Sequence, residues 1–264
     1  EKKNVGKIIQ CPYHSWTYDL NGSLKVSPHF GGTNNHKPQG FKNSDHGLKP
    51  IRIHVWNDWI FINLNGKAKK FKEYAKPLIK KFDDIDFKKL KYAATLDFGK
   101  IKTNWKFLIE NFIEPYHVQF VHKTTTNQPL KDHYTIVDGI CYGSGVDVKE
   151  EDNKNSSALS VTSRYLSLFP NFIIGTYFPN QVGVYLNIPI SPGVTSQKRI
   201  IYTTDGKEMT KEESNTTKKI WWSVHKEDHE MCERLQEGRY SPASKTGGLL
   251  SPVWEKGVQA FQKL

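Results

Sequence analysis

The stretch from Asn104 to His122, NWKFLIENFIEPYHVQFVH, places two histidines and a glutamate in a segment that otherwise has the pattern of a buried helix. Its apolar residues recur at the spacing of one helix face, namely Trp105, Leu108, Ile109, Phe112, Ile113 and Tyr116. Glu114 and His117 are three residues apart and are expected to project together from another side of that helix. Pro115 removes a backbone donor, so it is expected to bend or end the helix before His122. The combination predicts a metal site.

A third ligand is expected from a second helix, predicted over 220–238 with the sequence IWWSVHKEDHEMCERLQEG. Its apolar stripe consists of Trp221, Val224, Met231 and Leu235. Asp228 occupies the position in that stripe where another apolar residue is expected, and Gly238 is a predicted helix stop. A buried carboxylate is costly unless it is paired or bound to a metal. Two imidazoles and one carboxylate are the ligand set of non-haem Fe(II) oxygenases, and zinc accepts the same ligands.

Each of these residues also has an ordinary structural interpretation when it is taken alone. A single histidine is more often hydrogen-bonded within the fold than bound to a metal. Asp228 has polar neighbours along its helix, so a stripe displaced by one position would put it on the surface. Two other classes of function therefore stay open at this point: a zinc hydrolase that uses the same ligands, and a non-catalytic ligand-binding domain.

A second motif lies near the N-terminus, where residues 11–24 read CPYHSWTYDLNGSL. Cys11 and His14 resemble the second half of a Rieske motif, in which a Cys-x-His pair and a Cys-x2-His pair hold a [2Fe-2S] cluster. The pattern NWKxxxEN follows at 104–111 and ExYHxxxxH at 114–122. With this series of motifs, the chain resembles the alpha subunit of Rieske non-haem iron ring-hydroxylating oxygenases.

The resemblance implies a role for each residue of the predicted metal site. His117, His122 and Asp228 would be the ligands of a mononuclear Fe(II). Asn111 would stand beside the iron, and Glu114 would be the carboxylate that links the two metal centres of neighbouring subunits. Glutamate at this position is more similar to the branch of the family that oxidises choline, carnitine or betaine type compounds.

The [2Fe-2S] cluster would have only half of its ligands in this chain, because only Cys11 and His14 match the motif. Residues 1–10 contain neither cysteine nor histidine, and the chain does not begin with methionine. We therefore expect an N-terminally truncated chain that is inactive without the missing part. Cys141 and Cys232 fall in the other predicted domain and are not expected to replace the missing ligands.

The activity implied by the resemblance is that of a monooxygenase or dioxygenase acting on a small aromatic or quaternary-amine substrate. Electrons would come from NAD(P)H through a ferredoxin or a flavin reductase and would be used with O2. Electron transfer between subunits implies a homotrimer.

Composition is consistent with this interpretation. The net charge of +11 comes mainly from dispersed lysines, which could attract an acidic redox partner. No nucleic-acid motif accompanies them. Three cysteines cannot form a disulfide framework, which favours a reducing cytoplasm. Residues 165–197 contain no charged residue, but prolines and amides interrupt every apolar run, so no membrane span is expected.

The predicted fold class is α+β. Residues 1–66 are expected to form a partial all-β Rieske domain, with strands over 51–64 and a turn at Asn57. Residues 67–264 are expected to form a helix-grip catalytic domain, in which an antiparallel sheet wraps a long helix. The alternation from Val182 to Ile190 predicts a strand with one apolar face that lines or supports a cavity, and 147–156 is expected to be a polar loop.

Overall fold

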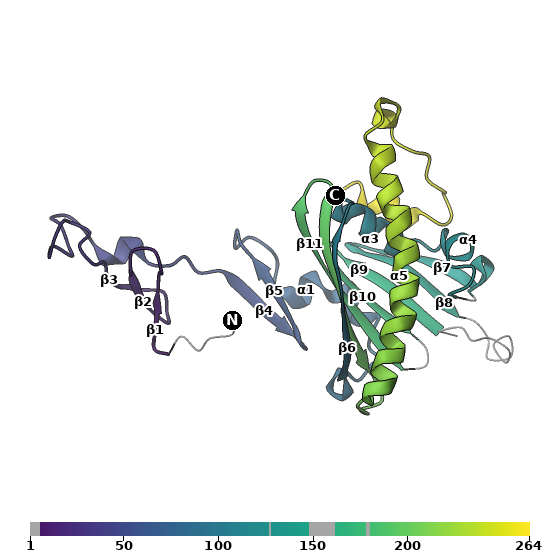
Figure 1. Ribbon diagram of the computed structural model, residues 1–264, viewed down its shortest axis with the longest axis horizontal. Helices are drawn as coiled ribbons and strands as arrows, with labels where there is room; N and C mark the ends of the chain where they lie inside the picture. Colours follow the sequence, from purple (N-terminus) through teal and green to yellow (C-terminus); the bar gives the residue numbers. More distant parts are fainter. Residues whose placement is uncertain (1–5, 127, 148–161, 178–179) are drawn as a thin grey trace. The chain divides into compact units, whose positions relative to one another are not determined.

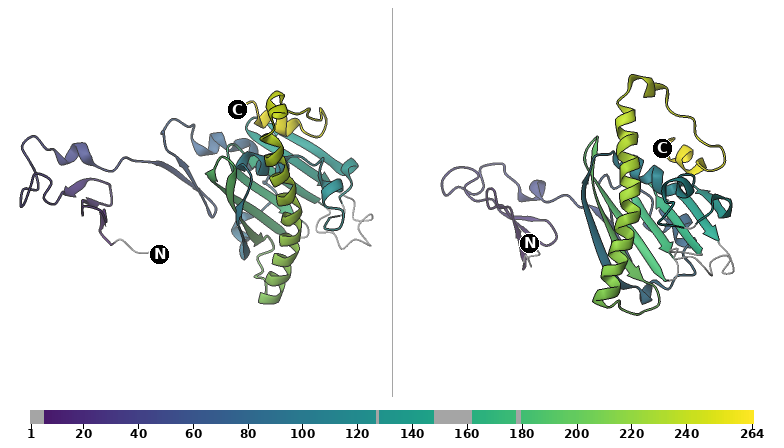
Figure 2. Two further views of the ribbon diagram at one scale, coloured as in Figure 1. Left: turned by 45° about the horizontal axis from the view of Figure 1, so that its top comes forward. Right: turned by 45° about the vertical axis from the view of Figure 1, so that its right-hand side comes forward.

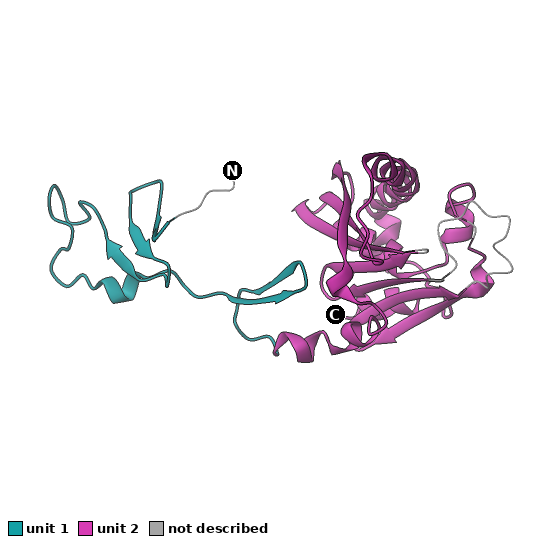
Figure 3. Ribbon diagram, turned by 90° about the horizontal axis from the view of Figure 1, so that it is seen from below, with its two compact units in different colours: residues 1–69 teal, residues 70–264 magenta. Residues whose placement is uncertain are grey.

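The computed structural model (Figure 1) describes residues 6–126, 128–147, 162–177 and 180–264. The chain forms two compact units, Glu1–Lys69 and Lys70–Leu264 (Figure 3), compared with the boundary at residue 66 expected from the sequence. The first unit contains short strands, whereas the second combines one large sheet with helices. The predicted α+β class is confirmed.

The first unit contains two small antiparallel sheets. One sheet has the order β1-β2-β3, and the other is the hairpin β4-β5. The bounds are β1 Ile8–Gln10, β2 Thr17–Asp19, β3 Leu24–Val26, β4 Arg52–Trp56 and β5 Trp59–Asn63, with a 3-10 turn at Asn43–His46. Asn57 has φ 53° in the turn that joins β4 to β5, a left-handed conformation that asparagine tolerates. The strands and the turn predicted over 51–64 are therefore present, and the structure shows that they form an antiparallel hairpin.

The second unit is organised by one seven-stranded antiparallel sheet with the order β6-β12-β11-β10-β9-β8-β7. The bounds are β6 Lys91–Ile101, β7 His133–Asp138, β8 Cys141–Asp147, β9 Thr162–Leu168, β10 Phe172–Tyr177, β11 Gln181–Ser191 and β12 Val194–Thr203. Strands β7 to β11 each pair with the next strand in sequence, while β6 forms one edge of the sheet and pairs with β12. The predicted polar loop between β8 and β9 falls almost entirely outside the described residues.

Helix α5, Lys211–Arg239, runs along one face of this sheet (Figures 1 and 2). Helix α3, Trp105–Ile113, packs against α5, α6 and strands β8, β9 and β11. The other helices are α1 Phe71–Tyr74, α2 Lys76–Lys80, α4 Val118–Val121 and α6 Lys256–Phe261, with 3-10 turns at Phe87–Lys89, Leu130–Asp132 and Pro242–Thr246. A sheet that holds a long helix in this way is the helix-grip arrangement expected for the catalytic domain.

Hydrogen bonds between α5 and the start of α3 fix the two helices that carry the candidate ligands. Thr103 Oγ1 donates to the Cys232 carbonyl at 3.0 Å, and the Asn104 backbone N–H donates to Gln236 Oε1 at 2.8 Å. Asn104 is also the N-cap of α3, because its side chain accepts from the Lys106 N–H. These hydrogen bonds therefore set the register between α3 and α5, and they lie on the same helix as the candidate ligand Asp228.

The predicted apolar face of β11 is only partly correct. Val182 and Val184 are buried, but the following apolar residues of the same phase, Leu186, Ile188 and Ile190, are 43–52% exposed. Tyr185 and Asn187, of the opposite phase, are buried. The alternation identified the strand correctly, but it did not show which face is covered along its whole length, because coverage depends on where α3 and α5 lie.

The environment of the cysteines agrees with a chain that has no disulfide framework. Cys11, Cys141 and Cys232 are all free thiols, and the latter two are buried. No helix in the described part of the chain has both the length and the hydropathy needed to cross a membrane.

Candidate metal centre

The segment after α3 differs from the single helix expected there. The helix ends at Ile113, and Glu114 has an extended backbone, φ −116° and ψ 143°. This follows from Pro115, because the residue before a proline is disfavoured in the helical region. Glu114 and His117 therefore do not project from one helix, which corrects that expectation, and Tyr116 is 43% exposed instead of buried.

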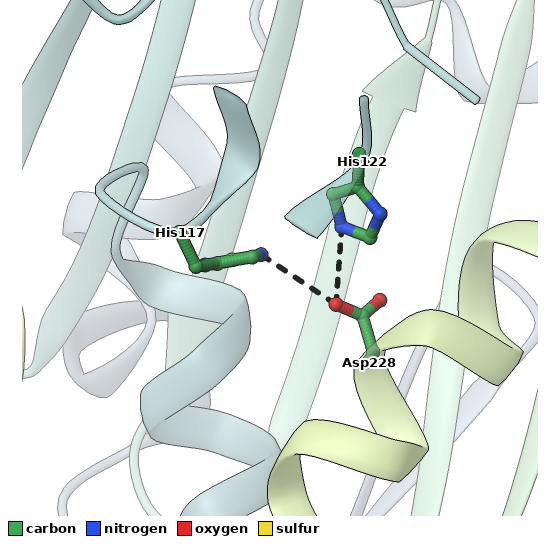
Figure 4. A group of neighbouring side chains, drawn as sticks. All are labelled: His117, His122 and Asp228. Carbon is green, nitrogen blue, oxygen red and sulfur yellow. Dashed lines mark ion pairs between the residues drawn. The ribbon is translucent and has the colours of Figure 1, made fainter. Parts of the chain in front are cut away.

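The irregular link brings together the two histidines that a straight helix would separate. His117 immediately precedes α4, and His122 immediately follows it. Asp228 reaches the same point from α5. His117 Nε2 lies 3.5 Å from Asp228 Oδ1, and His122 Nε2 lies 3.1 Å from the same oxygen (Figure 4). One ligand atom from each of the three residues lies within 4.8 Å of the other two.

The opposite ring nitrogens of both histidines face carboxylates. His117 Nδ1 is 2.5 Å from Glu114 Oε1, and His122 Nδ1 is 2.8 Å from Glu227 Oε2. A carboxylate on Nδ1 holds the proton there and leaves the Nε2 lone pair free for a metal. The contact between Glu227 and His122 was not predicted from the sequence, in which Glu227 is only a polar neighbour of Asp228.

Asp228 is held from a second side by α3. Asn111 Nδ2 donates to Asp228 Oδ1 at 3.0 Å, so the residue expected beside the iron contacts one of the candidate ligands. The other carboxylate oxygen, Oδ2, lies 4.0 Å from His225 Nδ1. These contacts restrict how the carboxylate can rotate.

The charges of the three residues are strongly coupled. Burial disfavours a charged His117, but Glu114 and Asp228 outweigh it and raise the pKa of His117 to about 10. Burial likewise opposes ionisation of Asp228, yet His122 and His117 hold the pKa of this carboxyl well below 3.8. The site therefore binds a proton tightly, and a metal bound at the same atoms would displace it.

The donor set fits the mononuclear iron that this kind of site would hold. Two imidazole Nε2 atoms and one carboxylate oxygen converge, and each imidazole has its own orienting carboxylate. Three protein ligands also leave coordination positions open.

A cavity of about 80 Å³ adjoins the three residues. Its aromatic lining consists of Phe112, Tyr165, Tyr177, Tyr185 and Trp221. Asn111 and Glu114 line it as well. The candidate ligands thus face a small cavity that has several aromatic side chains in its wall.

The face of α5 that points to the sheet is not quite the predicted stripe. Trp221 and Val224 are buried as expected, but Leu235 is 53% exposed, whereas Cys232 and Gln236 are buried. The helix ends at Arg239, one residue after the predicted stop. Asp228 nevertheless lies on the inward side, with its side chain only 14% exposed.

The Cys11 and His14 pair lies in the connection between β1 and β2. The Cys11 backbone N–H donates to the Trp16 carbonyl at 2.8 Å, and Ser15 has φ 59°. Cys11 is partly exposed and His14 is exposed. In the described part of the chain, no third histidine, cysteine or carboxylate joins this pair in a metal-binding group. Two ligands do not satisfy a cluster that needs four.

Two known protein families match different parts of this chain. Residues 85–264 match the model of the ring hydroxylating alpha subunit, catalytic domain, and residues 1–37 match the Rieske [2Fe-2S] domain. The chain belongs to the ring hydroxylating alpha subunit family. The two matches imply a mononuclear iron and a Rieske cluster as the cofactors of such proteins.

Individual relatives agree with the family assignment. The chain is 27% identical over 261 residues to a chloroplastic choline monooxygenase of Atriplex hortensis, covering 95% of this chain but 57% of that protein. It is 34% identical over 122 residues to the glycine betaine monooxygenase oxygenase subunit of Pseudomonas aeruginosa, covering 46% of this chain and 27% of that protein. The chain therefore spans little more than half the length of the choline monooxygenases.

Solved structures share the fold. The quaternary ammonium Rieske monooxygenase CntA superimposes with a TM-score of 0.77 at 19% identity, covering 98% of this chain and 71% of that chain. Naphthalene 1,2-dioxygenase superimposes with a TM-score of 0.65 at 18% identity, covering 93% and 65%. Both comparisons support the helix-grip architecture of the second unit.

Proposed function

We propose that the chain is the catalytic part of a Rieske-type oxygenase that oxidises a small organic substrate, aromatic or quaternary-amine, with O2. The observation that carries the proposal is the convergence of His117 Nε2, His122 Nε2 and Asp228 Oδ1 beside an aromatic cavity. An iron ion bound there would supply the activation of O2 with electrons delivered from outside the cavity. Membership of the family supports the same assignment.

The protein's own contribution is to hold the ligands and to shape the cavity. Glu227 orients His122, and Asn111 orients Asp228. The aromatic side chains in the cavity wall would replace water around a bound substrate on their side, which would strengthen polar interactions there. An aromatic ring or a methylated amine would both suit such a lining.

Glu114 has a proposed role beyond its contact with His117. Within this proposal it is the carboxylate through which the site communicates with the electron-donating centre of a neighbouring subunit. Its Oε2 also accepts from the backbone N–H groups of Tyr116 and His117, so its position is fixed by the link itself. A homotrimer, a ferredoxin or flavin reductase as partner, and a reducing cytoplasm complete the proposal.

Metal content tests the proposal directly. After anaerobic reconstitution with ferrous iron, we expect about one iron per chain bound at the three-residue site. His117→Ala, His122→Ala and Asp228→Ala should each lose that iron while keeping their far-ultraviolet circular dichroism. Glu230→Ala is the matched control, because Glu230 lies on the same helix as Asp228 and is exposed. Unchanged iron in all three ligand variants would overturn the site.

The same measurement separates the alternative functions. Zinc retained in preference to iron, with loss in the same variants, would favour a hydrolase. No specific metal would favour a non-catalytic ligand-binding domain. The matches to both the catalytic and the Rieske family models argue against each of these alternatives.

A further inference from the structure

Arg199, on β12, is a completely buried cation surrounded by aromatic rings. Its exposed fraction is 0%. The guanidinium carbon lies 3.3 Å from the ring centroid of Trp221, 4.5 Å from that of Tyr177 and 5.1 Å from that of Tyr185. Cations at these distances are attracted by the faces of aromatic rings. The protein has thus placed its own positive charge in an aromatic cage.

In the described part of the chain, the charge of Arg199 has no anionic partner in direct contact. Nη1 donates to His225 Nε2 at 3.1 Å, whereas Nε and Nη2 have no hydrogen-bond partner among the described residues. No carboxylate oxygen of those residues lies within ion-pair distance of the guanidinium, and Asp228 is reached only through His225. A buried charge is costly unless it is paired, and ring faces compensate it only in part.

The guanidinium lies directly behind the wall of the candidate active-site cavity. Each of the four side chains that contact it also lines that cavity, namely Tyr177, Tyr185, Trp221 and His225. A charge separated from a cavity by one layer of side chains is weakly screened, because water is excluded from the space between them. The cavity therefore receives a positive field from Arg199, while the carboxylates of Glu114 and Asp228 in its wall face His117 and His122.

This arrangement bears on the charge of the substrate. Aromatic cages are a common receptor for quaternary ammonium groups, but here Arg199 already occupies the cage formed by Tyr177, Tyr185 and Trp221. A second cation at the same rings would meet a like charge, whereas a carboxylate would be attracted. We propose that Arg199 makes this cavity select substrates that carry a carboxylate or another anionic group and reject those whose only charge is positive. The inference rests on the proposed function, since it names the substrate class of the same site.

Four small ligands of nearly the same shape provide the test. They are 3,3-dimethylbutyrate, an anion; 3,3-dimethylbutanol, its neutral analogue; glycine betaine, a zwitterion; and choline, a cation. Binding to the full chain would be followed by tryptophan fluorescence, to which Trp221 contributes, both with anaerobically loaded iron and without metal. We expect the anion to bind about tenfold more tightly than the neutral analogue, and glycine betaine to bind more tightly than choline.

Variants of Arg199 assign the preference to this residue. Arg199→Met should reduce the advantage of the anion to less than about twofold, and Arg199→Lys, which keeps the charge, should retain most of it. Replacement of a buried charge by an apolar residue of similar size is often tolerated. The ranking in the unmodified chain tests the proposal even if a variant does not fold.

Three results would overturn the proposal: no binding of either carboxylate ligand, equal affinity for the charged and neutral ligands, or an anion preference that persists in folded Arg199→Met. The last result would mean that Arg199 serves only to balance Asp228 through His225. Iron content is measured separately. Normal iron binding without an anion preference would therefore reject this inference alone, whereas an anion preference without iron binding would reject the oxygenase.

Discussion

Glu227 lies on the side of His122 that points away from the candidate ligand cluster. Its Oε2 is 2.8 Å from His122 Nδ1, while His122 Nε2 is 3.1 Å from Asp228 Oδ1. Glu227 and Asp228 are consecutive on α5, so a single turn of helix supplies one candidate ligand and the carboxylate that orients another. Thr125 Oγ1 donates to the same Glu227 oxygen at 2.6 Å, which fixes this carboxylate in turn.

Loss of the Glu227 carboxylate should weaken metal binding without abolishing it. Carboxylates that orient a histidine ligand typically contribute 10–100-fold to metal affinity. We expect Glu227→Ala to raise the Kd for ferrous iron by about that factor, measured by competition with a chelator. Glu227→Gln keeps an acceptor for His122 Nδ1 and should recover part of the loss. Equal affinity in Glu227→Ala and in the exposed control Glu230→Ala would show that His122 is oriented by other contacts.

Asn111 should have a smaller effect through a different ligand. Its Nδ2 donates to Asp228 Oδ1, which is the oxygen that both histidines approach. Asn111→Leu removes that donor at similar volume and should raise the Kd for iron by about tenfold. The chelator assay serves again, and far-ultraviolet circular dichroism reports whether α3 is intact. Wild-type affinity in the folded variant would mean that Asp228 needs no support from α3.

The three candidate ligands could be named from the sequence more readily than the residues that contact them, although their binding of a metal stays a prediction. Asp228 was identifiable because a carboxylate interrupts an apolar stripe, and Pro115 signalled the break in the backbone that brings His117 and His122 together. Periodicity could not show that Gln236 faces inward and Leu235 outward, because Gln236 accepts a hydrogen bond from a different element. The spacing of apolar residues shows only which face of a helix is buried on average, not whether each residue on that face is buried.

The roles of Arg199 and Glu227 were not predicted from the sequence, for different reasons. Glu227 lies beside Asp228 in a run of charged residues, and only the position of His122 distinguishes it. Arg199 did leave a signal: it occupies the same phase of β12 as Thr195, Gln197 and Ile201, all buried. A cation in the buried phase of a strand is unusual enough to be noticed, but its aromatic surroundings come from three other elements and depend on tertiary structure.

The cysteines should differ sharply in reactivity. Burial raises the pKa of the Cys141 thiol to about 12 and that of Cys232 well above 9, and both are 0% exposed, whereas Cys11 is partly exposed. Because the thiolate is the reactive form, iodoacetamide at pH 8 should modify Cys11 in the folded chain and spare the other two. Urea should make all three reactive, as counted by mass spectrometry. Modification of Cys141 without urea would contradict its burial at the start of β8.

Glu110 on α3 provides a test of stability against pH. Burial raises the pKa of its carboxyl above 4.5, although a hydrogen bond from Gln262 Nε2, 3.0 Å long, partly opposes this. A pKa raised by folding favours the folded state below the unfolded pKa, and this contribution is lost as the pH rises through the folded pKa. Glu110→Gln keeps an acceptor for Gln262 without the charge, so it should raise the Tm at pH 8 and give a smaller gain at pH 5. The exposed control Glu230→Gln should show no such pH dependence. An equal gain in Tm for Glu110→Gln at both pH values would mean that folding does not raise the pKa of the Glu110 carboxyl.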